Sequence, residues 1–288
     1  MRILLTLSFF VLHTALGFAQ NVDAIRVHRT GDAAGATTIY LPGFATPGEA
    51  LEELATAVDP ARNNLFVSYA GFGGVPAVDT AWYPQVREAV FAYVDDLPDQ
   101  RFALVGHSMG GNLAVELAAR FPERVTAVVL LDALPCMRCV MMPGVPAEAM
   151  TYNNPQTQGM LALPADQVAA VNAQMAAAMT TDTARQRQLA AWMNAADRKT
   201  SVYGYTDLLR LDLRDQVADV TAPITVLASP SFGRETAETN MRAQYAKAPA
   251  LTLEVAPDGT LHYLMWDAPV WTATQVRKAL AHQAEPRG

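Results

Sequence analysis

Short apolar runs alternate along this chain with longer amphipathic stretches, and this alternation limits the folds that the sequence can adopt. Uniformly apolar runs such as 103–105 and 128–131 suit strands that are buried on both faces of a sheet. Strands of this kind that alternate with helices are typical of a mostly parallel sheet flanked by helices. We therefore predict an α/β fold. The predicted strands are 37–41, 65–69, 102–106, 125–132, 224–229 and 251–255, with an edge strand at 22–27, and the predicted helices are 49–58, 83–95, 110–120, 236–246 and 270–283.

The alternation stops between residues 136 and 214, where the chain is rich in Ala, Gln and Met. This segment has helical spacing at 166–179 and 183–196 and no strand pattern. We predict that residues 20–135 and 215–288 form the core, and that 136–214 form a helical cap inserted after its sixth strand. Eight of the twelve Met residues lie in the cap. They either fill gaps between helices or form a pliable apolar ceiling over a pocket.

The charge balance excludes one class of function. The chain has 21 Lys and Arg residues against 28 Asp and Glu residues, a net charge of −7, and no basic run. It therefore lacks the electrostatic footprint of a nucleic-acid binder. A small-molecule substrate is the better expectation.

The first 19 residues have the pattern of a secretory signal peptide. Arg2 precedes a mostly apolar run over 3–18, and the small residue Ala19 follows it. The run is shorter than the roughly 20 apolar residues that a spanning helix needs, so we predict no stable membrane span. We predict cleavage near Ala19 and export to the periplasm or the medium.

The two cysteines, Cys136 and Cys139, are predicted to form a disulfide, because an exported protein meets an oxidising compartment. Thioredoxin-like redox motifs have the same spacing, but this pair follows a strand and opens no obvious helix. A zinc site would need further ligands, and no His or other Cys supplies them nearby. We therefore predict no metal site.

The segment 106–110 reads Gly-His-Ser-Met-Gly and matches the pattern G-x-S-x-G. It joins the predicted strand 102–106 to the predicted helix 110–120, so Ser108 falls at a sharp turn above the carboxyl edge of the sheet. The flanking glycines remove side chains that would clash with the neighbouring strand and helix. Ser108 is thus a candidate nucleophile, and the backbone N–H of Met109 faces any developing oxyanion.

Together with two further segments, this motif resembles the α/β-hydrolase family across nearly all of the chain after residue 19. The segment 41–44, Leu-Pro-Gly-Phe, is similar to the family's oxyanion loop, in which His-Gly is commoner. The segment 258–269 is similar to the family's histidine loop. The resemblance implies the α/β-hydrolase fold with an inserted helical cap, and it implies the backbone N–H of Phe44 as a second oxyanion donor.

Elimination points to His262 as the general base. It lies after the predicted strand 251–255, on a loop that can return to the sheet edge, and it follows the nucleophile in the order that this fold uses. A Ser hydroxyl is a poor nucleophile until a neighbouring imidazole accepts its proton. The other histidines are His13 in the predicted signal peptide, His28 near the start, His107 in the nucleophile motif and His282 near the end.

The third member of a Ser-His-acid triad has two candidates. Many relatives place an Asp after the seventh strand, but the predicted strand 224–229 leads into Pro-Ser-Phe-Gly-Arg, with Glu235 only beyond it. Asp132 ends the sixth strand, from which some family members supply the acid. A short turn at the same sheet edge is the better place to reach His262, so we predict Asp132 and keep Glu235 as the alternative.

The resemblance implies hydrolysis of an ester, thioester or lactone through a covalent acyl-enzyme on Ser108, without a cofactor. The apolar cap favours an uncharged substrate. A serine at this turn argues against the dehalogenase and epoxide-hydrolase branches, which use Asp. Hydrolysis of a carbon–carbon or amide bond and perhydrolysis stay open, as does a ligand-binding or sensing protein that keeps the scaffold.

Overall fold

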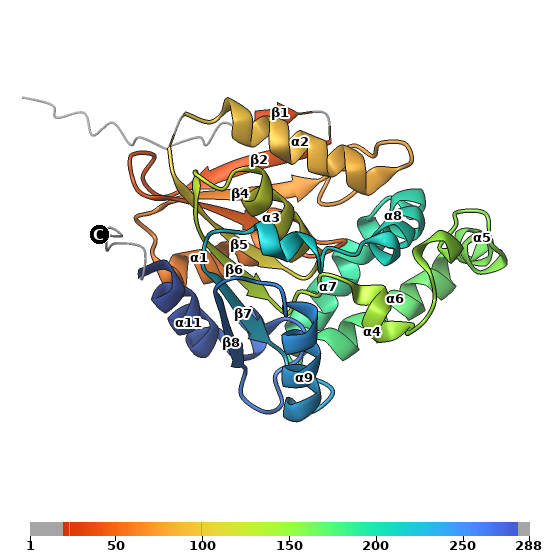
Figure 1. The fold of residues 1–288 in the computed structure, drawn as a ribbon. Helices are drawn as coiled ribbons and strands as arrows, with labels where there is room; N and C mark the ends of the chain where they lie inside the picture. The colour runs from red at the N-terminus through yellow and green to blue at the C-terminus, as the bar shows by residue number, and fades with distance from the viewer. Residues whose placement is uncertain (1–19, 23, 99, 282–288) are drawn as a thin grey trace, which may run out of the picture.

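The computed structural model describes residues 20–22, 24–98 and 100–281 of the 288. In that part of the chain one eight-stranded sheet runs in the order β1-β2-β4-β3-β5-β6-β7-β8 (Figure 1). The pairs β1–β2 and β2–β4 are antiparallel, and all other neighbours are parallel. The strands are β1 (Gln20–Val22), β2 (Ile25–Thr30), β3 (Thr37–Leu41), β4 (Asn63–Tyr69), β5 (Phe102–His107), β6 (Val125–Leu131), β7 (Ile224–Ala228) and β8 (Leu251–Val255).

The predicted α/β architecture is confirmed, and the six predicted core strands match β3 to β8 to within two residues at each end. The predicted edge strand 22–27 is wrong in form, because that stretch is divided between β1 and β2. These two strands pair antiparallel with each other, and β2 then pairs with β4. The edge of the sheet is therefore a hairpin.

Helices cover both faces of the sheet because side chains alternate along each central strand. On β5, Leu104 joins one buried cluster together with residues of α2 (Trp82–Asp96), α3 (Met109–Arg120) and α9 (Arg234–Gln244). The next residue, Val105, joins the other cluster, together with residues of α1 (Glu52–Val58) and α11 (Pro269–Ala281). The predicted helix 49–58 begins as the 3₁₀ turn η1 (Gly48–Leu51) before it becomes α1.

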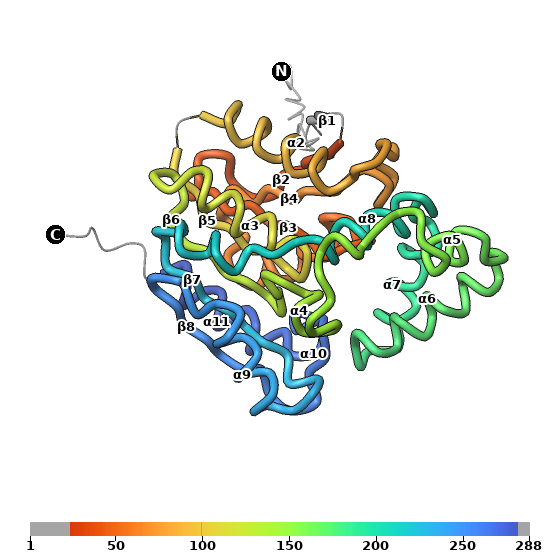
Figure 2. Tube along the Cα trace, turned by 45° about the vertical axis from the view of Figure 1, so that its right-hand side comes forward, coloured from red at the N-terminus to blue at the C-terminus, as the bar shows by residue number. Residues whose placement is uncertain are grey.

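Between β6 and β7, residues 136–214 form five α-helices and no strand, and the structure describes all of these residues. We refer to them as the cap segment, whose outer helices project from the sheet in both views (Figures 1 and 2). The predictions at 166–179 and 183–196 match two of the five helices, and the other three were not predicted. The helices are α4 (Met137–Met141), α5 (Pro155–Ala162), α6 (Ala165–Met179), α7 (Thr183–Ala195) and α8 (Arg198–Arg210).

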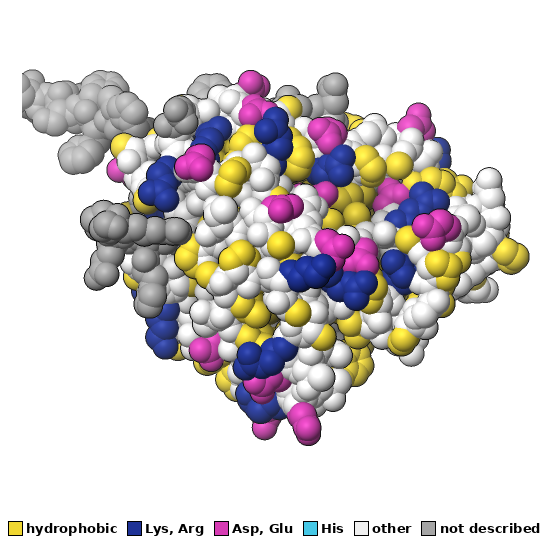
Figure 3. Space-filling model, in the orientation of Figure 1, with side chains coloured by type: hydrophobic (Ala, Val, Ile, Leu, Met, Phe, Trp, Pro, Cys, Tyr) yellow, Lys and Arg dark blue, Asp and Glu magenta, His cyan; other side chains and the backbone are white. Residues whose placement is uncertain are grey.

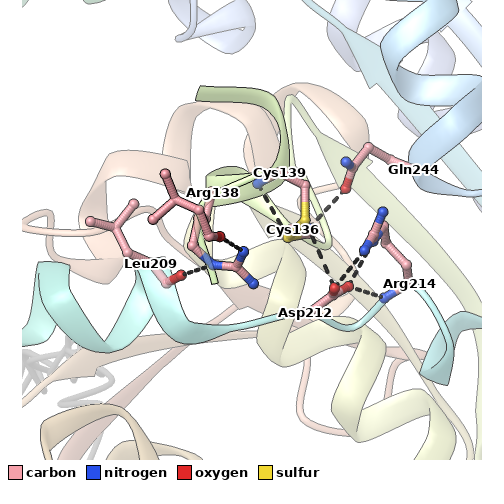
Figure 4. Close-up of a disulfide and its surroundings, with 8 residues drawn as sticks. Cys136, Arg138, Cys139, Leu209, Asp212, Arg214 and Gln244 are labelled. Atoms are coloured by element: carbon pink, nitrogen blue, oxygen red, sulfur yellow. Dashed lines mark hydrogen bonds and ion pairs between the residues drawn. A yellow bond between two sulfur atoms is a disulfide. The ribbon is translucent and has the colours of Figure 1, made fainter. Parts of the chain in front are cut away.

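The two ends of the cap segment lie side by side. The backbone N–H of Leu213 donates to the carbonyl of Pro135 at 3.0 Å. Next to this contact Cys136 and Cys139 form the predicted disulfide (Figure 4). Contrary to the prediction, the pair does open a helix, because Cys136 precedes α4 and its sulfur accepts from the N–H of Cys139 at 3.3 Å.

The carboxylate that lies beside the disulfide was also not predicted from the sequence. An oxygen of Asp212 lies 3.8 Å from the sulfur of Cys139, although 73 residues separate the two in the sequence. The two sulfurs and a carboxylate oxygen of Asp212 lie within 4.8 Å of one another. A metal binds cysteine as the thiolate, and in this structure both sulfurs are bonded to each other.

Charged side chains of both signs are interspersed over the face drawn in Figure 3. Among the described residues, no helix is both long and apolar enough to cross a membrane. The predicted signal peptide, residues 1–19, lies outside the part of the chain that the structure describes.

Candidate active site

Ser108 occupies a strained turn between β5 and α3. Its φ of 51° and ψ of −122° lie in a region that non-glycine residues seldom adopt. Two glycines make the turn sterically feasible. A Cβ on Gly106 would lie 2.5 Å from the carbonyl oxygen of Gly110, and a Cβ on Gly110 would lie 2.0 Å from that of Leu41. Ser108 is partly exposed, whereas the other four residues of the motif are buried.

The predicted oxyanion loop lies directly beside this turn. A Cβ on Gly43 would lie only 3.3 Å from the Cβ of Ser108. The loop is closed by Thr46, whose hydroxyl donates to the carbonyl of Gly43 at 2.9 Å. Helix α3 begins at Met109, so the N–H of that residue has no intrahelical acceptor. The structure thus brings the loop that carries Phe44 next to Ser108, and Met109 follows Ser108 at the start of α3.

The imidazole of His262 meets the carboxylate of Asp132. Nδ1 of His262 lies 2.7 Å from Oδ2 of Asp132, and the two side chains are 26% and 16% exposed. The second oxygen, Oδ1, accepts from the backbone N–H of Ser229 at 2.9 Å. The backbone N–H of Asp132 donates to Leu227 at 2.8 Å, so the carboxylate is fixed at the end of β6. In this geometry Nδ1 carries the proton and Nε2 is free to accept one.

The alternative acid, Glu235, lies elsewhere. It stands in the first turn of α9, and its side chain is exposed. The position directly after β7 is taken by Ser229, whose amide supports Asp132. The geometry therefore agrees with Asp132 as the partner of His262, while the catalytic roles of these residues stay predictions.

His107 has a place in the site that sequence reasoning missed. Its Nε2–H donates to the carbonyl of His262 at 3.0 Å, and the two rings lie 4.6 Å apart. Burial lowers the pKa of His107 well below 6.5, and the neighbouring His262 lowers it further. The ring is therefore neutral and holds the histidine loop against the nucleophile turn. Its position next to Ser108 in the sequence motif could have indicated this supporting role.

We expect His107 to make stability depend on pH. The unfolded chain binds a proton here near pH 6.5 whereas the folded chain does not, so the free energy of unfolding falls as the pH drops below 6.5. This residue contributes at most about 1.4 kcal/mol per pH unit, until the folded imidazole is itself protonated. Denaturant unfolding between about pH 7 and pH 5 measures the slope. His107→Gln keeps an N–H donor and should flatten the slope. Parallel curves for the two proteins would contradict this assignment.

Helix α8 of the cap segment packs directly on the oxyanion loop. A Cβ on Gly204 would lie 3.0 Å from Cε2 of Phe44 and 3.0 Å from Cε3 of Trp82. The Phe44 ring also meets Phe72 edge to face at 4.9 Å and lies 6.3 Å from the ring of Tyr205. The surroundings of Phe44 are therefore aromatic and apolar.

Comparison with known proteins agrees with this architecture. A family model described as the alpha/beta hydrolase fold matches residues 83–269, which include Ser108, Asp132 and His262. A protein of Mycobacterium phage D29 named as a non-heme haloperoxidase is 33% identical over 115 residues, 38% of this chain and 41% of its own length. A pimeloyl-[acyl-carrier protein] methyl ester esterase of Aeromonas hydrophila is 27% identical over 208 residues, 69% of this chain and 78% of the esterase.

Among solved structures, a hydrolase from Pseudomonas aeruginosa PA01 superposes with a TM-score of 0.75 at 17% identity, covering 93% of this chain and 99% of its own. At that identity the similarity concerns the fold. Because the family model matches well over half of the chain, the chain belongs to the α/β-hydrolase family. Within it, the relatives that the chain resembles include methyl ester esterases.

Proposed function

We propose that the chain is an exported serine hydrolase that cleaves an ester, thioester or lactone bond through a covalent acyl-enzyme on Ser108. The observation that carries the proposal is the 2.7 Å contact between Nδ1 of His262 and Oδ2 of Asp132. This pair stands at the edge of the sheet where Ser108 follows the end of β5, because β5 and β6 are parallel neighbours. A nucleophile, a base and an acid that orients the base are the elements that acyl transfer requires.

In the proposed reaction, Oγ of Ser108 attacks the substrate carbonyl while Nε2 of His262 takes its proton. The tetrahedral oxyanion accepts hydrogen bonds from the backbone N–H groups of Phe44 and Met109. His262 then passes the proton to the leaving group, which departs and leaves the acyl group on Ser108. Water attacks next, and the same imidazole first removes its proton and then returns it to Ser108. The carboxylate of Asp132 orients the imidazole and stabilises the imidazolium.

Several contacts support an apolar, uncharged substrate. The ring of Phe44 lies among those of Phe72, Trp82 and Tyr205, and the cap segment carries eight of the twelve Met residues. Fluorophosphonate labelling tests the proposed function. A panel of p-nitrophenyl esters and lactones of graded acyl length, run on unlabelled protein, tests the substrate preference as well. Wild-type protein that neither reacts with the probe nor turns over any member of the panel would refute the hydrolase proposal.

The haloperoxidase name of the phage relative favours perhydrolysis as a second candidate. In that reaction hydrogen peroxide rather than water attacks the acyl-enzyme and releases a peracid. Formation of peracid from an ester and peroxide, compared with hydrolysis of the same ester, separates the two reactions. A third candidate is a sensing protein, which would bind a ligand without turnover.

We expect the mature protein to begin near Gln20 and to keep the Cys136–Cys139 disulfide. The N-terminal pattern supports removal of residues 1–19, and an oxidising compartment stabilises the bond. Intact mass of protein secreted by a host cell measures both, since reduction adds two hydrogens. Full-length protein with two free thiols would contradict both parts of this expectation.

A further inference from the structure

Asp267 links the cap segment to the loop on which His262 lies. It ends the short helix α10 (Leu264–Asp267), five residues after His262. Its Oδ2 accepts from the backbone N–H of Leu261 at 2.9 Å. Its other oxygen, Oδ1, faces the turn between α6 and α7. One oxygen of this carboxylate therefore accepts from the residue next to His262, and the other accepts from the cap segment.

Three donors of the α6–α7 turn converge on Oδ1 of Asp267. They are the hydroxyl of Thr180 at 2.6 Å, the backbone N–H of Thr181 at 2.9 Å and the hydroxyl of Thr181 at 3.0 Å. Thr180 is fully buried. A carboxylate with four donors around it is held firmly, since charged acceptors make the stronger hydrogen bonds.

The backbone on the other side of His262 is held by the same turn. The N–H of Tyr263 donates to the carbonyl of Met179, the last residue of α6, at 3.0 Å. The carbonyl of His262 itself accepts from His107 of the core. The residues before and after His262 are thus fastened to the cap segment, and His262 itself is fastened to the nucleophile turn.

Besides this turn, the α6–α7 hairpin packs on the core mainly through partly buried side chains such as Trp192, whose ring lies 6.2 Å from that of Trp266. Ala176 is the one buried residue of α6, and Leu189 is the one buried residue of α7. Outside the turn, Arg185 contributes an ion pair with Glu53 and lies over the ring of Trp266 at 5.3 Å. The turn is the part of the hairpin that is hydrogen-bonded to the histidine loop, so a shift of the hairpin is transmitted to that loop.

We propose that Asp267 is a positioning residue that couples the α6–α7 hairpin to His262. It touches no reacting atom in the proposed mechanism. It holds the backbone beside His262 at a place defined by the cap segment, so that the position of the hairpin sets the alignment of the imidazole with Ser108. The inference rests on the proposed hydrolase function, and it adds that the cap segment acts on kcat and not only on substrate binding.

Asp267→Asn tests the coupling. The amide has one acceptor oxygen, so its NH₂ group must face either the N–H of Leu261 or that of Thr181. We expect kcat to fall about tenfold to a hundredfold with KM changed less than about threefold, because a small misplacement of a catalytic group costs rate more than binding. The matched control is Asp258→Asn. Asp258 is the first residue of the same segment, is 86% exposed and pairs, among the described residues, with Arg234, so kcat should not change.

A second variant isolates the cap side of the contact. Thr180→Val keeps the shape of the buried side chain and removes both its donor to Asp267 and its acceptor for the N–H of Asp182, which lies in the same turn, while the bond to Leu261 remains. We expect a smaller loss of kcat, about threefold to tenfold on the same reasoning. This variant decides the question if Asp267→Asn does not fold. A Thr180→Val protein with wild-type kcat would overturn the coupling.

A readout that needs no turnover separates this inference from the proposed function. The proton on Nδ1 of His262, shared with Asp132, gives a low-field ¹H NMR signal, which should shift or broaden in Asp267→Asn and not in Asp258→Asn. The proposed function fails if the wild type neither reacts with a fluorophosphonate nor turns over any ester or lactone of the panel. The coupling alone fails if labelling needs Ser108 but Asp267→Asn keeps its kcat and this signal, or if only KM rises.

Discussion

Replacement of Ser108 by Ala is expected to abolish ester turnover and fluorophosphonate labelling. Loss of the nucleophile of a triad typically lowers kcat on the order of a millionfold, because the covalent intermediate can no longer form. The measurement is the hydrolysis of a chromogenic ester, with labelling detected on the intact protein. The strained turn makes folding a necessary control, and the unfolding midpoint should match the wild type or exceed it.

The outcome of this experiment is informative in either direction. Labelling that persists in Ser108→Ala would move the nucleophile to another residue and remove the basis of the proposed mechanism. If Ser108→Ala loses both labelling and its folded state, the nucleophile is identified in wild-type protein instead, by mapping the peptide that the probe modifies.

Asp132→Asn is expected to lower kcat by roughly 10⁴, because the amide can present a donor to Nδ1 of His262 and the imidazolium loses its counter-charge. The contact is 2.7 Å long, and the second oxygen is held by Ser229, so the side chain cannot turn away freely. The measurement is kcat for the best ester of the panel. Circular dichroism of the variant checks that the fold is kept.

Glu235→Gln is the matched control for this prediction. Its carboxylate is exposed on α9, so we expect less than a tenfold change in kcat, as for a residue without a contact in the transition state. A nearly active Asp132→Asn together with an inactive Glu235→Gln would reverse the assignment. It would return the acid to the position after the seventh strand.

The core strands and the candidate site were predictable because both follow from local patterns. Strands buried on both faces read as largely apolar runs, which is why 102–106 and 125–132 match β5 and β6 to within one residue at each end. Ser108 follows from the residues that surround a strand-to-helix turn. Asp132 follows from a geometric rule, since neighbouring parallel strands bring their carboxyl ends to one edge of the sheet.

The unpredicted helix α8 depends on tertiary contacts as well as on its own sequence. Helix α8 contains Thr, Ser, Val, Tyr and Gly, none of which favours a helix strongly. It forms where Gly204 allows it to lie on Phe44 and Trp82, and where the side chain of Asp197 accepts from the N–H of Thr200. Such contacts cannot be read from periodicity along one segment.

The supporting contacts of His262 were hidden for a similar reason. His107 and His262 are 155 residues apart, and Asp267 lies 86 residues from Thr181. Spacing along the chain identifies groups that act within one turn or one helix. It gives no information on a hydrogen bond between a loop and a helix hairpin inserted elsewhere in the fold.

The side-by-side ends of the cap segment make it a replaceable module. Because the N–H of Leu213 meets the carbonyl of Pro135, the length of chain between them can change without altering the register of β6 and β7. Loop closure costs little for each added residue, so such an insertion can grow or shrink at small cost in stability. Helix α8 and the α6–α7 turn are the exceptions, since α8 packs on the oxyanion loop and the turn binds the loop of His262. Substrate range can therefore diverge by exchange of α5, while α8, the α6–α7 turn and the catalytic edge stay constant.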